Sequence, residues 1–130
     1  MILHPELLVQ YHREIEEMYF REFKQTPDNT FVYFGIFAQA ILQAAATLKW
    51  HKGHWFLQGC VVKPEYRGQG LQRRLIEERV EYIQGRASNV LVVVHPHNYA
   101  SRTNIERSGF TFLDKTQVDG DEVHVYIRYL

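Results

Sequence analysis

A strand, a helix and a second strand are predicted between residues 55 and 94, and this succession constrains the fold more than any other feature. Trp55 to Val62 is rich in aromatic and β-branched residues, which favour strands. Gly70 to Arg86 carries apolar residues along one side and charges along the other, as in an amphipathic helix. Val90 to Val94 is a continuous apolar run, typical of a strand buried on both faces of a sheet. A helix between two strands of one sheet makes a crossover unit, so an α/β fold is expected.

The rest of the chain supplies a further helix and further strands. After Pro5, apolar residues recur every three or four positions up to Met18, which predicts an amphipathic helix. The alanines at 44–46 favour helix by propensity, but the shortness of their apolar run and the strands around it favour a hairpin. The other expected elements are strands at 31–37 and 41–48, a loop at 25–29, a helix at 99–108 and a closing hairpin with its turn at 119–120. Together they predict an α/β (α+β) fold, a mixed sheet with helices packed on it.

Length and composition predict one globular domain. With 130 residues, the chain suits a single domain, residues 1–130, with one hydrophobic core. Hydrophobic residues make up 45% and charged residues 23%, the composition of a globular protein. Fifteen Lys and Arg balance fifteen Asp and Glu, so no net charge draws the chain to a polyanion or an acidic membrane. Neither nucleic acid nor a membrane is therefore expected as a partner.

The cysteine content and the N-terminal sequence predict a cytoplasmic location. Cys60 is the single cysteine, so it cannot close a disulfide within the chain. The first residues lack the basic and then apolar layout of a secretory signal, and no apolar run approaches the about 20 residues that span a bilayer. Cys60 itself lies in an apolar strand, which favours a buried core residue over a nucleophile.

The segment from Val61 to Leu75 places glycines between the end of a strand and the start of a helix. The first turn of a helix has unpaired N–H groups and the positive end of the helix dipole, so it attracts phosphate. Gly68 and Gly70 would let such a group approach the backbone closely. An anion is therefore expected at this turn.

Arginines around the turn support an anion site, with one alternative. Arg67, Arg73 and Arg74 put cations near the helix start, where they oppose the dipole unless an anion lies among them. The alternative is that Arg73 and Arg74 pair with the glutamates one turn later, at positions 77 and 78. The sequence leaves both interpretations open for these two residues.

The glycine pattern differs from two common phosphate-binding motifs. A P-loop would need a Gly-Lys-Ser or Gly-Lys-Thr ending, and a dinucleotide fingerprint would need three spaced glycines with an acidic residue about 20 positions further on. Neither is present. Residues 62–71, Val-Lys-Pro-Glu-Tyr-Arg-Gly-Gln-Gly-Leu, instead resemble the coenzyme-A signature of the GCN5-related N-acetyltransferase (GNAT) superfamily, often written Arg/Gln-x-x-Gly-x-Gly/Ala. Arg67 and Gly70 match its first two fixed positions, and Gln72 stands where the family usually has Gly or Ala.

A second segment extends the likeness. Asn98, Ser101 and Ser108-Gly109-Phe110 are similar to the family's second coenzyme element, which is an Asn after the fifth strand, a short helix and Gly-Phe. Asn98 also suits a plain helix cap, which is compatible with that role. The resemblance implies a mostly antiparallel central sheet with a central splay and helices on both faces. It also implies acetyl-CoA as acyl donor, and a homodimer through the closing strands is common in the family.

The resemblance implies how the coenzyme lies. The pantetheine arm would pair with the backbone near Val62, between the splayed strands, and the amides of Gly68 to Gln72 would hold the pyrophosphate. Asn98 and Asn104 would contact the pantetheine or adenosine end. The residues expected to bind the coenzyme are Val61, Val62, Lys63, Arg67, Gly68, Gln69, Gly70, Leu71, Gln72, Arg73, Asn98, Ser101 and Asn104.

Transfer of an acyl group from a thioester to an amine needs a polarised carbonyl, a neutral amine and a stabilised leaving thiolate. The backbone N–H of Val62 is expected to polarise the carbonyl. His95 is the predicted base, because imidazole gains and loses a proton near neutral pH, although it also suits an ordinary loop histidine. Many GNAT enzymes place a Tyr acid where this chain has Ile105. Tyr99 is the nearest substitute, or else an aromatic residue packed against the sheet edge.

The expected function follows from these assignments. The chain is predicted to be an N-acetyltransferase that moves an acetyl group from acetyl-CoA to a primary amine by direct attack in a ternary complex. The alternative is a non-catalytic acyl-CoA-binding or sensing protein on the same fold, which Ile105 and the lack of a carboxylate on the strand at 55–62 keep open. A metal site is not expected, because His95 and His97 lack a third ligand at suitable spacing.

Overall fold

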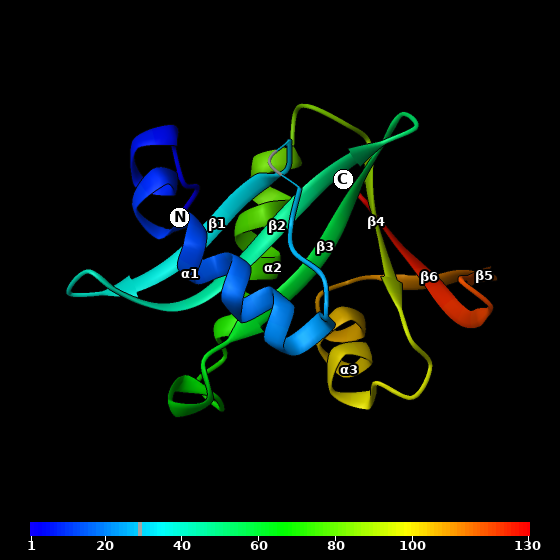
Figure 1. The fold of residues 1–130 in the computed structure, drawn as a ribbon. Helices are drawn as coiled ribbons and strands as arrows, with labels where there is room; N and C mark the ends of the chain where they lie inside the picture. Colours follow the sequence, from blue (N-terminus) through cyan, green and yellow to red (C-terminus); the bar gives the residue numbers. More distant parts are fainter. Residues whose placement is uncertain (29) are drawn as a thin grey trace.

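A six-stranded sheet with helices on both faces makes up the fold (Figure 1). The computed structural model describes residues 1–28 and 30–130. The strand order is β1-β2-β3-β4-β6-β5, and every neighbouring pair is antiparallel except β3 and β4. The predicted mixed, mostly antiparallel sheet is confirmed. Its strands are β1 (Val32–Ala38), β2 (Ile41–His51), β3 (His54–Val62), β4 (Asn89–Val94), β5 (Thr111–Val118) and β6 (Asp121–Tyr129).

Each face of the sheet is covered by a long helix. In Figure 1, α1 (Pro5–Phe23) crosses in front of β1 to β3, and α2 (Leu71–Ile83) lies behind them. Successive residues of a strand point to opposite faces, so Tyr33 packs in the core beneath α1 and Phe34 in the core beneath α2. The short helix α3 (Tyr99–Arg107) contributes Ile105 to the α2 side. Helices on both faces are therefore confirmed.

The parallel strands β3 and β4 stay together over a short length only. Their paired residues are Phe56 with Leu91 and Leu57 with Val92. Beyond Leu57, β3 carries a β-bulge at Gly59, whose φ of +72° lies in the left-handed region. The strands then diverge toward the end of β3. This is the central splay that the sequence resemblance implied.

Several elements differ in extent from the prediction. The helix expected at 70–86 is shorter, because Gly70 has a φ of +76° and Gln84 has a ψ of 130°, neither of which an α-helix allows. The second strand continues to His51, so it is longer than the expected range of 41–48. In the predicted loop, residues 25–28 are neither helix nor strand, and Asn29 lies outside the described residues. No helix in the described ranges is long and apolar enough to cross a membrane.

Candidate functional site

A cleft of about 950 Å³ opens where β3 and β4 diverge. It is lined from both faces of the sheet. The α1 side contributes Tyr19 and Glu22, the α2 side contributes Gly70 and Gln72, and the hairpin of β5 and β6 contributes Asp119. The splay thus forms a passage that is reached from both sides of the sheet.

A row of unpaired backbone amides lies at one end of this cleft. In the described part of the chain, no protein oxygen accepts a hydrogen bond from any N–H between Gly68 and Arg73. The first amide of α2 that bonds back is that of Arg74, which donates to the Gly70 carbonyl at 3.1 Å. A Cβ built at Gly68 or Gly70 would meet no protein atom within 4 Å. The space in front of these amides is open, and the arrangement fits a diphosphate group.

The arginines around this row separate into different roles. Arg74 pairs with Glu78 at 3.3 Å, which is the alternative that the sequence left open. Arg73 has no carboxylate partner among the described residues and lines the cleft. Arg67 donates from Nε to the Val62 carbonyl at 3.2 Å, and its Nη2 forms an ion pair with Glu22 of α1 at 3.9 Å. Arg73 therefore adds positive charge at the cleft, whereas the charge of Arg67 is partly offset by Glu22.

The peptide group of Val62 faces the splay. Lys63 donates its N–H to the Gln43 carbonyl of β2 at 3.0 Å. Because adjacent residues of a strand direct their peptide groups to opposite sides, the Val62 N–H points away from β2 and toward the gap beside β4. The Val62 carbonyl points the same way, which is why Arg67 can reach it. The predicted backbone donor is therefore placed where a group lying in the splay would meet it.

The second predicted element borders the same cleft. Asn98 caps α3 by accepting the Ser101 N–H at 3.2 Å, and both residues line the cleft. Asn104 donates from Nδ2 to Gln72 Oε1 at 2.7 Å, so α3 is joined to the first turn of α2. This bond directs the Gln72 side chain toward α3. It accounts for how a long side chain fits at a position where the family pattern has a small residue.

A sequence model of the Acetyltransferase (GNAT) family matches residues 2–110. The chain belongs to the GNAT family. A search of curated protein sequences found no match.

Solved GNAT-fold structures are similar over most of the chain. The ribosomal-protein-S18-alanine N-acetyltransferase from Escherichia coli has 20% identity and a TM-score of 0.73, with 99% of this chain and 91% of that one covered. The IAA acetyltransferase from Bacillus cereus has 13% identity and a TM-score of 0.69, with 100% and 97% covered. A Bacillus anthracis protein provisionally described as a streptothricin acetyltransferase, in complex with acetyl coenzyme A, has 16% identity and a TM-score of 0.68, with 85% and 68% covered. At these identities the likeness concerns the fold.

The residues predicted for catalysis are not all brought together in this GNAT chain. His95 directly follows β4 and lines the cleft. Tyr99 is 71% exposed and does not line it, so its position disfavours the predicted acid role. The reason is helix phase: Ser101 and Ile105 face the cleft, and Tyr99 lies about half a turn away from them on α3. Ile105, at the family's Tyr position, is buried.

Two residues predicted to bind the coenzyme lie outside the cleft lining. Lys63 forms an ion pair with Glu14 of α1 at 2.6 Å, and its amide belongs to the pairing with β2. Gln69 does not line the cleft, although its amide is in the unpaired row. Val61 does line it, but its side chain is buried in the core beneath α1. The remaining predicted residues line the cleft, namely Val62, Arg67, Gly68, Gly70, Leu71, Gln72, Arg73, Asn98, Ser101 and Asn104.

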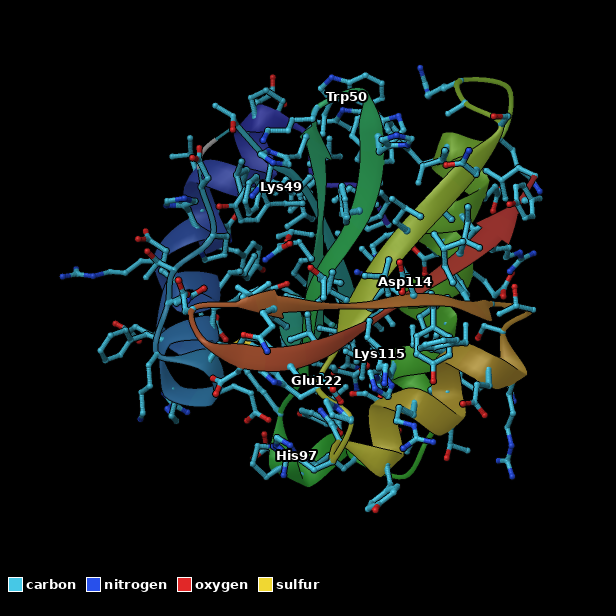
Figure 2. The ribbon with its side chains drawn as sticks, turned by 90° about the vertical axis from the view of Figure 1, so that its right-hand side faces the viewer. Lys49, Trp50, His97, Asp114, Lys115 and Glu122 are labelled. Atoms are coloured by element: carbon cyan, nitrogen blue, oxygen red, sulfur yellow. The ribbon has the colours of Figure 1, made fainter. Side chains whose placement is uncertain are left out.

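Carboxylates that line the cleft were missed by the sequence analysis. They are Glu22 near the end of α1, which pairs with Arg67, and Asp119 and Asp121 at the turn between β5 and β6. Figure 2 shows this hairpin crossing in front of the strands, with its turn reaching toward α1. No spacing in the sequence relates Glu22 to the hairpin, because only the packing of the fold brings them to one cleft.

Cys60 borders the cleft without the properties of a nucleophile. Burial raises the pKa of the Cys60 thiol to about 11. The thiol therefore stays protonated at neutral pH, and a thiol attacks carbonyl groups poorly compared with a thiolate. This agrees with the predicted packing role.

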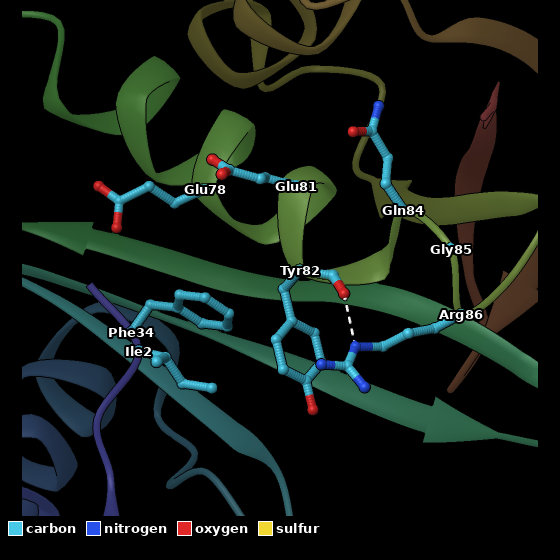
Figure 3. A pocket seen from close by; sticks show the side chains of 8 residues that line it. All are labelled: Ile2, Phe34, Glu78, Glu81, Tyr82, Gln84, Gly85 and Arg86. Carbon is cyan, nitrogen blue, oxygen red and sulfur yellow. Dashed lines mark hydrogen bonds between the residues drawn. The ribbon is translucent and has the colours of Figure 1, made fainter.

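A separate pocket of about 550 Å³ lies beside the C-terminal end of α2 (Figure 3). Two of its charged side chains are already bonded to protein groups. Arg86 donates from Nε to the Tyr82 carbonyl at 2.7 Å, and Glu78 pairs with the N-terminal amino group and with Arg74. In the described ranges, the amides of Gln84 and Arg86 at this pocket donate to backbone carbonyls, unlike the amides of the row that begins at Gly68. The cleft at the splay is therefore the candidate site.

Proposed function

We propose that this GNAT chain transfers an acetyl group from acetyl-CoA to a primary amine by direct attack in a ternary complex. The observation that carries the proposal is the cleft at the splay, which is lined both by the unpaired amides at the start of α2 and by Asp119 and Asp121 of the hairpin between β5 and β6. Phosphates of the coenzyme suit the amides. A cationic amine suits the hairpin, because Asp119 and Asp121 favour positive charge. The two substrates can thus meet between β3 and β4.

The reaction assigns a task to each group near the splay. The amine nitrogen attacks the thioester carbonyl carbon, the carbon–sulfur bond breaks, and coenzyme A leaves as the thiolate. The Val62 N–H donates to the carbonyl oxygen as negative charge develops on it. His95 takes the proton that the amine loses, because it is the histidine that borders the cleft. The cytoplasmic location and the homodimer expected from the sequence stay predictions.

A second candidate function rests on Ile105. This residue is buried and cannot donate a proton to a leaving thiolate, and β3 carries no carboxylate. The alternative is therefore a protein that binds acyl-CoA without turnover. It predicts tight binding of acetyl-CoA and no acyl transfer to any amine.

A thiol-release assay distinguishes the two functions. The intact chain is incubated with acetyl-CoA and a panel of amines, comprising polyamines, aminoglycosides, lysine peptides and peptides with a free N-terminal alanine. The last class is included because the Escherichia coli neighbour is named for an alanine of ribosomal protein S18. We expect release of coenzyme A that depends on an amine, with the acetylated product seen by mass spectrometry. Binding of acetyl-CoA by calorimetry without product from any amine would favour the binding function.

The base is tested by the pH dependence of turnover. If His95 takes the amine proton, removing the imidazole takes away the proton acceptor. We expect His95→Ala to lower kcat by about 10²-fold and to change the pH profile of the rate. His97→Ala is the matched control, because His97 lies beside His95 at 5.5 Å between ring centres but does not line the cleft. An identical pH profile in the wild-type and His95→Ala chains would contradict the role of His95.

A further inference from the structure

Arg79 is a buried cation with no anionic partner in the described chain. It lies in the middle of α2 and is 2% exposed. Its guanidinium donates from Nε to the Leu75 carbonyl at 3.1 Å. Its Nη1 donates to the Thr47 carbonyl at 3.1 Å and to the Gly59 carbonyl at 3.0 Å. Burying a charged group costs free energy unless hydrogen bonds compensate for it. The buried guanidinium is therefore expected where backbone carbonyls lack another donor.

Two of these three carbonyls, those of Thr47 and Gly59, lie at the β-bulge. Gly59 is the extra residue of β3, since Thr47 pairs with Gln58 and Ala46 pairs with Cys60. A bulge interrupts the ladder and leaves peptide groups that the neighbouring strand cannot bond. Here the Gly59 carbonyl is bonded by Arg79 from the α2 side of the sheet.

The preceding carbonyl is bonded from the opposite side. Gln58 accepts from Thr47 Oγ1 at 2.6 Å and from the Tyr19 hydroxyl of α1 at 3.1 Å. Tyr19 Oη also lies 3.4 Å from Thr47 Oγ1. Side chains from α1, β2 and α2 thus converge on two consecutive carbonyls of the bulge. These bonds fix its peptide groups from both faces of the sheet.

The bulge decides which amide faces the splay. It follows Leu57, the last residue of β3 paired with β4, and it precedes Val62. Peptide groups alternate sides along a strand, so an extra residue reverses the alternation for every residue after it. Without Gly59 as the extra residue, the Val62 amide would face β2 and the Val61 amide would face the splay. The geometry of the bulge therefore sets the direction of the Val62 N–H.

We propose that Arg79, Thr47 and Tyr19 form a clamp that holds the bulge at Gly59 and thereby aims the Val62 N–H into the splay. The clamp is defined by these three side chains. Its catalytic consequence rests on the proposed function, in which the Val62 N–H polarises the thioester carbonyl. Arg79 is a positioning residue in this scheme, because it acts on the substrate through the bulge. Replacement should affect turnover far more than coenzyme binding.

Arg79→Met tests the clamp with a side chain of similar length. Methionine fills the space of the arginine stem but leaves the Thr47 and Gly59 carbonyls without their donor. We expect kcat to fall about 10²-fold, the loss typical of a small misplacement of a reacting group. The Kd for CoA should stay within about twofold, since the unpaired amides lie at the start of α2, away from Arg79. Arg79→Lys, which keeps a donor, should recover part of kcat.

Arg86→Met is the matched control. Arg86 also donates from its Nε to a carbonyl, that of Tyr82, but it is exposed and distant from the bulge in sequence. Rates are expressed per folded molecule. The folded fraction of each variant is measured by circular dichroism and size-exclusion chromatography. If Arg79→Met loses stability but keeps the wild-type kcat and the wild-type KM for acetyl-CoA, the clamp is overturned and Arg79 is only structural.

Amide chemical shifts report on the clamp without any turnover. In ¹⁵N spectra of the wild-type chain and of the variants, we expect the Val62 amide to shift in Arg79→Met and to stay unchanged in Arg86→Met. If this shift occurs but no amine is acetylated by the wild-type chain, the clamp stands and the proposed function fails. If the amine is acetylated but the Val62 amide does not shift, the clamp fails and the function stands.

Two milder variants keep the test decisive if Arg79→Met does not fold. Tyr19→Phe and Thr47→Val each remove one hydroxyl that donates to the Gln58 carbonyl. Both should shift the Val62 amide and lower kcat about tenfold, with the Kd for CoA unchanged. An unshifted Val62 amide and a wild-type kcat in both variants would overturn the clamp.

Discussion

Val62→Pro is expected to lower kcat for acetyl transfer by about 10²-fold to 10³-fold, the range found when one donor to a developing oxyanion is removed. Proline has no N–H, so the substitution deletes the donor that faces the splay. The pairing of β3 with β2 loses no hydrogen bond, because the Val62 amide points away from β2. Coenzyme binding should persist, since the row of unpaired amides begins at Gly68.

The control for this variant is Val62→Ala, which shortens the side chain and keeps the N–H. We expect Val62→Ala to retain most of the turnover that Val62→Pro loses. Steady-state kinetics with acetyl-CoA and the best amine of the panel give kcat, and calorimetry with CoA gives the dissociation constant. Equal kcat values for the two variants would show that the Val62 N–H takes no part in the reaction.

The row of unpaired amides could be predicted from the sequence because its chemistry is local. A strand end, two glycines and a helix start follow one another from Val62 to Leu71, and the amides that remain unpaired are those of the first helical turn. The same holds for Asn98, whose cap bond spans only three residues. Such features need no knowledge of the tertiary packing.

The carboxylates that line the cleft could not be predicted, because they come from distant segments. Glu22 lies on α1, whereas Asp119 and Asp121 lie at the far end of the chain, and they border one cleft only when the hairpin of β5 and β6 crosses the sheet. The role of Arg79 depends on packing as well. Its spacing of four from Leu75 and Ile83 places it on the buried side of α2, and only the folded sheet brings the Gly59 carbonyl to it there.

The rotation of α3 about its own axis could not be predicted from the sequence either. The sequence correctly predicted a short helix after Asn98, with its end one residue earlier than expected. It did not determine which side of that helix meets the cleft. Packing of Ile105 against the α2 side fixes the rotation, and Tyr99 is then directed outward. A helix of nine residues has too few apolar positions for its sequence alone to define its buried side.

Gly68→Ala is the second substitution for which a large effect is expected, and it acts on coenzyme binding. Gly68 has a φ of +79°, and a Cβ there would project into space that no protein atom occupies within 4 Å. In the complex we expect this space to be filled by the diphosphate, so the methyl group would push it away from the amides. Loss of one hydrogen bond to a charged group costs about 1.5–3 kcal/mol. We therefore expect the Kd for CoA to rise about tenfold to a hundredfold.

Gly53→Ala separates this effect from backbone strain. Gly53, at the turn between β2 and β3, has a φ of +85° and likewise no atom within 4 Å of an added Cβ. Both substitutions force alanine into the left-handed region, at a cost of about 1–2 kcal/mol, so both should lower the melting temperature by a similar amount. Only Gly68→Ala should weaken CoA binding in calorimetry, because Gly53 does not line the cleft. Equal affinities of the two variants for CoA would mean that the diphosphate is bound somewhere other than the start of α2.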